Sequence, residues 1–129
     1  MARRKTKTLT ELELEIMRVV WSKEEVTVED VRQALKEQGK SLALPSIRTM
    51  LAILQEKGYV TRRPLGRGFA HRARVRREDA RESIVRDVIE RAFDGSALGL
   101  VATLMSGELV SKGEIRKVKD LIWRHKEPA

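Results

Sequence analysis

Hydrophobic residues recur at helical spacing in the first part of the chain, and each run follows a recognisable helix start. Thr10 can cap a helix, and Glu13, three residues on, completes a capping box for a helix that runs to about Trp21. Thr27 and Asp30 repeat this combination ahead of a second apolar stripe about three turns long. Two short capped helices are therefore predicted.

A third helix is predicted over residues 45–57, because Pro45 suits a first helical position and Gly58 a helix end. Its apolar positions recur at i, i+3, i+4 and i+7 and should face the core. These positions are Ile47, Met50, Leu51 and Leu54, which leaves Ser46, Arg48, Thr49 and Ala52 on the outer side.

The period changes from helical to alternating after Gly58. Residues 59–63 and 69–75 are predicted as strands, and residues 64–68, with Pro64, Gly66 and Gly68, as the turn between them. Three short helices followed by a basic hairpin is the layout of a winged helix-turn-helix. The fold class expected is mainly α with a small β-hairpin wing. Because this layout is typical of DNA-binding proteins, residues 1–75 are expected to form a winged-helix DNA-binding domain.

The rest of the chain, residues 76–129, is predicted to be helical. Its segment 97–105 is apolar nearly all round and should be buried on every side, yet about fifty residues offer too little core for that. A second copy of the chain could cover it, since homodimers are the commonest oligomers. A helical dimerisation domain is therefore expected, with an interface at Ile84, Val88, Leu98, Val101, Leu104, Met105, Ile115, Val118 and Ile122.

Positive charge is concentrated in the predicted winged helix. The net charge of the 129-residue chain is +8, and residues 1–75 carry 16 Lys and Arg against 9 Asp and Glu. Between Glu56 and Glu78 there are eight Lys and Arg and no acidic residue. Such a stretch repels itself unless a polyanion faces it, and phosphate is the commonest such partner. A solvated basic face explains the charge alone equally well.

The predicted interface combines base reading with phosphate contacts. On the third helix, Ser46, Arg48 and Thr49 should meet base edges in the major groove, where an arginine can bind guanine through two hydrogen bonds. Basic residues of the wing and of the preceding loop should contact the DNA backbone, which positions a protein without reading sequence. These are Lys40, Arg62, Arg63, Arg67 and Arg72, with Arg3, Arg4 and Lys5 as further candidates in an N-terminal arm.

Several segments together resemble one repressor family. The run from Leu9 to Trp21, then Ser46–Thr49, Leu54–Val60 and the stretch from Arg77 to Ser96, is similar in order and spacing to the penicillinase and methicillin-resistance repressors, with their copper-responsive relatives. The resemblance covers about residues 8–126. It implies a winged helix, a helical dimerisation region and operator binding as a symmetric dimer that blocks transcription. It also implies that Ser46, Arg48 and Thr49 lie at the DNA surface.

Members of this family often lose repression when a protease linked to a membrane sensor cuts the dimerisation region. The corresponding segment here, Ala102–Met105, lacks the Asn-Phe pair of the antibiotic-responsive members, which argues against such a protease partner. The chain has no cysteine, so it lacks the C-terminal cysteine cluster of the copper-responsive branch. His71 stands where many relatives carry an aromatic residue.

Other classes of function are less well supported by the residues. An enzyme would need a nucleophile with a base, a paired carboxylate site or a metal site, and the two histidines, His71 and His125, have no partner recognisable from spacing. Neither a metal nor a cofactor is expected, and no apolar run is long enough to cross a membrane, so a cytoplasmic protein is expected. A sequence-indifferent nucleic-acid-binding protein and a winged-helix protein-interaction module remain as alternatives.

Overall fold

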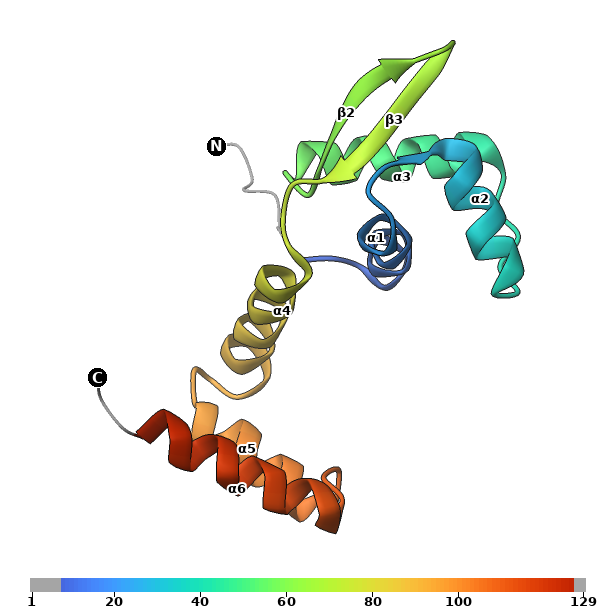
Figure 1. Cartoon of the computed structure of the whole chain (residues 1–129). Helices are drawn as coiled ribbons and strands as arrows, with labels where there is room; N and C mark the ends of the chain where they lie inside the picture. Colours follow the sequence, from blue (N-terminus) through green and yellow to red (C-terminus); the bar gives the residue numbers. More distant parts are fainter. Residues whose placement is uncertain (1–7, 127–129) are drawn as a thin grey trace, which may run out of the picture. The chain divides into compact units, whose positions relative to one another are not determined.

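The computed structural model describes residues 8–126, which fold into two compact units (Figure 1). The first unit extends to Val85 and the second begins at Arg86. The predicted arm residues Arg3, Arg4 and Lys5 lie outside the described residues. No helix within residues 8–126 combines the length and the apolar character needed to span a membrane.

The first unit is a winged helix, as the sequence predicts. Three helices come first, and an antiparallel hairpin follows them at the place where the hydrophobic period changes from helical to alternating. The helices are α1 (Glu11–Ser22), α2 (Val28–Glu37) and α3 (Leu44–Glu56), and the strands of the wing are β2 (Val60–Leu65) and β3 (Gly68–Ala73).

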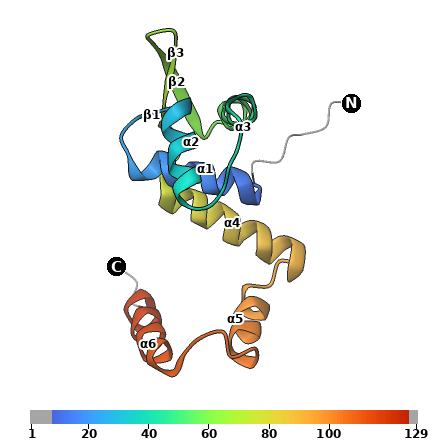
Figure 2. The same ribbon diagram turned by 90° about the vertical axis from the view of Figure 1, so that its right-hand side faces the viewer.

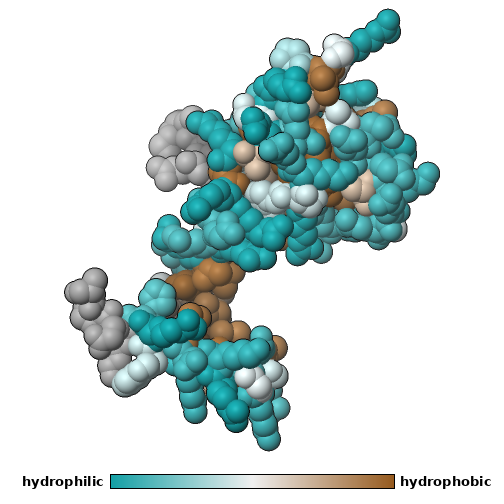
Figure 3. All heavy atoms as spheres, viewed as in Figure 1, coloured by the Kyte–Doolittle hydropathy of each residue, from teal (hydrophilic) through white to brown (hydrophobic). Residues whose placement is uncertain are grey.

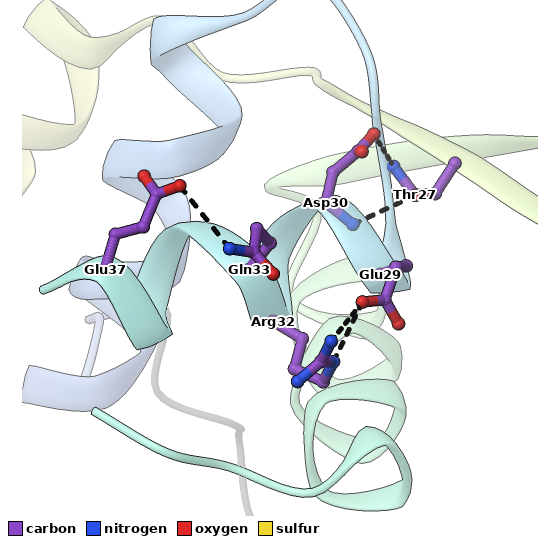
Figure 4. Close-up of polar contacts among 6 residues, drawn as sticks. All are labelled: Thr27, Glu29, Asp30, Arg32, Gln33 and Glu37. Atoms are coloured by element: carbon purple, nitrogen blue, oxygen red, sulfur yellow. Dashed lines mark hydrogen bonds and ion pairs between the residues drawn. The ribbon is translucent and has the colours of Figure 1, made fainter. Parts of the chain in front are cut away.

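Both predicted capping boxes are present. In α1 the Thr10 hydroxyl accepts a hydrogen bond from the Glu13 amide at 3.2 Å, and the Glu13 carboxylate accepts one from the Thr10 amide at 2.9 Å. In α2 the amide of Asp30 donates to the Thr27 hydroxyl at 3.0 Å and the amide of Thr27 donates to the Asp30 carboxylate at 2.9 Å (Figure 4). Each box satisfies two backbone donors that a helix start would otherwise leave free.

The sheet has a third strand that the sequence analysis did not predict. Residues Val26 and Thr27 form β1, which pairs with β3 so that the strand order is β1-β3-β2. Val26 lies opposite His71, and His71 lies opposite Arg62 on the other side. A strand of two residues shows no alternation in the sequence, which explains why the pattern gave no signal for it.

The core of this unit is made by the inward faces of the three helices and the base of the sheet. Trp21 closes one edge, where its indole Nε1 donates a hydrogen bond to the carbonyl of Val75 at 2.9 Å. Ala80, in the first turns of α4 (Arg77–Ala92), is fully buried in the same core. The compact unit therefore includes the start of α4, about ten residues beyond position 75. The fully buried residues include Ile16, Met17, Val20, Val31, Leu35, Ile47, Leu51 and Leu54.

The second unit contains the rest of α4, α5 (Ala97–Ser106) and α6 (Lys112–Lys126). Ser96 caps α5 by accepting a hydrogen bond from the Gly99 amide at 2.9 Å. The sequence predicts that the apolar helix 97–105 is buried all round, but in one copy of the chain no residue of α5 is buried. Figure 3 shows hydrophobic residues at the surface where α4 gives way to α5.

Candidate nucleic-acid interface

The outer face of α3 is free of packing, as predicted. Its core side is fixed by Ile47, Leu51 and Leu54, which are buried, while the side chains of Ser46, Arg48 and Thr49 are exposed. Within residues 8–126 the guanidinium group of Arg48 has neither a hydrogen bond nor an ion pair. Arg48 can therefore bind an external acceptor without breaking an internal contact.

The start of α3 has no side-chain cap, although the amides of Ser46 and Ile47 already donate to the Ala43 carbonyl, at 3.0 and 3.2 Å. The N-cap residue Ala43 has no side chain that accepts a hydrogen bond, and Pro45 stands in the first turn, where its missing N–H costs nothing. The positive end of the helix macrodipole is thus accessible beside Ser46 and favours a nearby phosphate.

The wing lies beside α3. Helix α3 contacts β2, and the two elements are neighbours in both views of Figures 1 and 2. The hairpin turns at Gly66, which adopts a left-handed conformation with φ of +59°, and places Arg67 at the tip. The side chains of Arg62, Arg67 and Arg72 are all exposed, so the wing presents three guanidinium groups on the same unit as α3.

Phe69 has a role on the wing that the sequence analysis missed. The guanidinium carbon of Arg62 lies 3.9 Å from the centroid of the Phe69 ring, which is a cation–π contact. This contact restricts the long Arg62 side chain to the face of the hairpin. The sequence alone does not give the register of the two strands. Arg62 and Phe69 become neighbours only because the register places Pro64 opposite Phe69.

One arginine of the basic wing has an acidic partner. This corrects the expectation that the cations between Glu56 and Glu78 lack any counter-charge within the chain. Glu25 reaches across the sheet to Arg63, with Oε2 2.7 Å from Nε and Oε1 2.8 Å from Nη2. This forked hydrogen bond holds the pKa of the Glu25 carboxyl below its ordinary value, and Arg72 lowers it further through its charge. The assignment of Arg63 to the DNA backbone stays a prediction, and it now requires a guanidinium already held by a carboxylate.

Two other basic residues of this region also have acidic partners. The ammonium group of Lys40 lies 2.8 Å from the Glu15 carboxylate in an exposed pair, which raises the pKa of Lys40. Lys57, counted in the basic stretch after Glu56, has a side chain only 9% exposed, and its ammonium group lies 2.8 Å from the Glu13 carboxylate. Lys57 therefore joins α3 to α1 and contributes nothing to a phosphate-facing surface.

His71 is buried in the sheet rather than presented to solvent. The residue is only 4% exposed, and its Nδ1 has no hydrogen-bond partner among the described residues. Burial lowers the pKa of His71, and the nearby charge of Arg62 lowers it further. His71 is thus a packing residue at the base of the wing. Within residues 8–126, no cluster of His, Asp or Glu side chains is arranged to hold a metal ion.

The predicted dimer residues lie on α4, α5 and α6. Several are unusually exposed for apolar side chains in one copy, above all Leu98 at 78% and Ile122 at 61%. Val88, Val101, Met105 and Val118 are also exposed, whereas Ile84, Leu104 and Ile115 are half-buried. Leu109, Leu121 and Trp123 share this exposure and were not among the predicted residues.

Comparison with known proteins connects this arrangement to one family. The sequence profile of the penicillinase repressor family matches residues 9–124. The chain is 23% identical over 118 residues to the methicillin resistance regulatory protein MecI of Staphylococcus aureus, a match that covers 92% of this chain and 95% of that protein. It is 24% identical over 123 residues to the penicillinase repressor of Bacillus licheniformis, with 95% of each chain covered.

A solved structure matches the first unit. The solution structure of the DNA-binding domain of the repressor BlaI is 26% identical in sequence, covers 60% of this chain and 93% of its own, and superposes with a TM-score of 0.51. The match supports the winged-helix fold, and the profile extends over the second unit as well. The resemblance predicted from the sequence is confirmed: this chain belongs to the penicillinase repressor family.

Proposed function

We propose that this protein is a transcriptional repressor that binds a palindromic operator duplex as a homodimer. The observation that carries the proposal is the pairing of two exposed elements on one unit: α3, with Ser46, Arg48 and Thr49 outward, and the wing beside it. A helix of this kind reads base edges in the major groove, while a basic hairpin contacts the backbone.

The arginines that are free to contact DNA support these separate roles for α3 and the wing. Arg48 and Arg67 have no partner within the part of the chain that the structure describes, and Arg62 is held against Phe69 with its edge open to solvent. Lys40 and Arg63 could reach phosphate only in competition with Glu15 and Glu25. We therefore place Arg48 on the bases and Arg62, Arg67 and Arg72 first among the backbone contacts.

Dimerisation is supported by the second unit. The side chains of Leu98, Val101 and Met105 recur at i, i+3 and i+7 along α5 and are 78%, 47% and 47% exposed. Monomeric soluble proteins rarely expose a continuous apolar face of this kind. A second copy of the same face would cover it, and the two-fold symmetry of the dimer would match a palindromic operator.

Selection of duplexes from a randomised library by the full-length protein tests the proposal directly. We expect one palindromic sequence to be bound roughly a thousandfold more tightly than unrelated duplex. Arg48→Ala should lower the preference for particular base pairs, by about 1–3 kcal/mol at the pair it contacts. Arg62→Ala should weaken all duplexes alike and reduce the slope of log K against log salt by about 0.9 for each lost phosphate contact.

Arg116→Ala is a matched control, since Arg116 is an exposed arginine of α6, outside the winged helix. It should leave affinity and preference unchanged. Equal binding to every duplex would favour a sequence-indifferent protein, and weak binding with little salt dependence would favour a protein-interaction module. Either result would overturn the repressor assignment.

The dimer is tested separately by sedimentation equilibrium. Leu98→Asp with Met105→Asp should shift the protein to monomer, because each substitution would place a charge in the apolar contact. Thr103→Asp puts the same charge on α5 away from this face, and it should leave the dimer intact. A wild-type chain that sediments as a monomer at micromolar concentration would contradict the proposal.

A further inference from the structure

A pocket of the first unit lies outside the proposed DNA-binding elements. It has a volume of about 440 Å³ and lies between α1 and the first turns of α4. This volume is within the range of small-molecule sites in proteins. None of Ser46, Arg48, Thr49 or the wing arginines lines it.

Three arginines surround this pocket, and all three are unpaired. Arg18 comes from α1, and Arg77 and Arg81 come from α4. Within residues 8–126 none of these guanidinium groups has a hydrogen bond or an ion pair. Two acidic residues close to them in sequence pair with other cations, since Asp79 pairs with Arg76 and Glu15 with Lys40. Positive charge from two helices therefore converges on the pocket.

The floor of the pocket is apolar and firmly held. It is made by Leu14, Trp21, Ala80 and Ile84. The hydrogen bond from the Trp21 indole to the Val75 carbonyl restrains the ring, and Ala80 is fully buried in the core of the unit. A ligand that enters the pocket can thus stack on an aromatic surface while its charge stays near the arginines.

We propose that this pocket binds a small organic anion, with a flat apolar body against Trp21 and a carboxylate, sulfonate or phosphate group among Arg18, Arg77 and Arg81. Arginine is suited to such groups because its planar fork donates two parallel hydrogen bonds. An inorganic anion would leave the apolar floor unused, and a neutral apolar molecule would leave the arginines uncompensated. A second copy of the chain, with its net charge of +8, complements three arginines less well than an anion does.

The proposal is tested on the full-length protein by following the indole N–H signals of its two tryptophans by NMR. Trp21→Phe identifies the Trp21 signal. We expect 2-naphthoate to shift this signal saturably, and the neutral 2-naphthamide, of the same shape, to bind at least fivefold more weakly. The double variant Arg18→Gln/Arg81→Gln should lose at least about fivefold in naphthoate affinity, while Arg116→Ala should bind as the wild type does.

Three results would overturn the proposal: equal affinity for naphthoate and naphthamide, displacement of naphthoate by an equal concentration of inorganic phosphate, or no shift of the Trp21 signal with either aromatic probe. The last result is the one expected if a second copy covers the pocket. If the double variant shifts the Trp21 signal without ligand, Arg77→Gln replaces it. Because the readout is independent of DNA, it separates this proposal from the repressor assignment.

Discussion

The buried ion pair between Glu13 and Lys57 allows a quantitative test of how the winged helix is held together. One carboxylate oxygen of Glu13 accepts from the Thr10 amide at 2.9 Å and from the Lys57 ammonium at 2.8 Å. Lys57 also donates to the Thr8 carbonyl at 3.1 Å. The side chains of Lys57 and Glu13 are only 9% and 4% exposed. A single carboxylate therefore caps α1 and neutralises a cation at the end of α3.

Replacing Glu13 by alanine removes both functions. Loss of one partner of a buried pair costs about 3–5 kcal/mol, and loss of a helix cap about 1 kcal/mol more. A unit of 85 residues has a total stability of roughly 4–13 kcal/mol. Glu13→Ala therefore threatens folding itself, and Glu13→Gln is the better perturbation. The amide oxygen of glutamine keeps an acceptor for Thr10 and Lys57 but loses the charge, so we expect a loss of about 2 kcal/mol.

Urea unfolding followed by Trp21 fluorescence, in a Trp123→Phe background, measures the first unit. With a urea dependence of about 1–2 kcal/mol per molar, Glu13→Gln should lower the midpoint by about 1–2 M. Combination with Lys57→Met should recover much of this loss, because no unpaired charge then remains buried. A coupling energy below about 0.5 kcal/mol in this double-mutant cycle would refute the reasoning. Glu11→Gln, at an exposed position in the same first turn, should change stability by less than about 0.5 kcal/mol.

Three further predictions concern the wing and its attachment. The pKa of His71 is lowered in the folded state by burial and by the charge of Arg62, so the unfolded chain binds more protons near pH 6.5. Stability should therefore fall as the pH drops through this value. His71→Phe should flatten the dependence of the urea midpoint on pH. Gly66→Ala should cost about 1–2 kcal/mol because φ is +59°, whereas Gly68→Ala should cost less, and thermal unfolding of the two variants compares them. Thr27→Ala should cost about 1 kcal/mol by urea unfolding, and Thr27→Ser should restore most of it; an unchanged midpoint for the alanine variant would contradict the role of the cap.

The local features of the first unit were readable from the sequence. The capping boxes at Thr10 and Thr27 depend on residues three positions apart, and the change of period at Gly58 marks the start of the hairpin. Such signals need no knowledge of the tertiary structure. They sufficed to predict three helices, a wing and the outward position of Arg48.

The pairing of charges was beyond the reach of the sequence pattern. Glu25 and Arg63 are 38 residues apart, and Glu13 and Lys57 are 44 residues apart. Nothing in the local spacing of either residue indicates its partner, so Arg63 and Lys57 were both counted as uncompensated charge. The same reasoning explains the pocket arginines, because Arg18 meets Arg77 and Arg81 only after α4 has packed against α1.

In the second unit, a single copy of the chain does not provide the burial that the sequence predicts for α5. The apolar character of α5 predicts complete burial, yet Leu98 is 78% exposed in a single copy. The pattern identified apolar side chains that need to be buried, and one copy of the chain does not bury them. For this reason the assignment of residues 76–129 to a dimerisation domain stays a prediction.

The smallest strand gives the wing a fixed angle. Thr27 pairs with Ala70 in the sheet and at the same time caps α2, whose inner face packs on α3. A tilt of the hairpin would have to pull on the first turn of α2. If the proposed function holds, the hairpin and α3 should therefore approach a duplex as one rigid body with a constant separation. A DNA sequence whose groove is too narrow or too wide would then lose contacts on both sides at once, and base pairs that no side chain touches would still influence affinity.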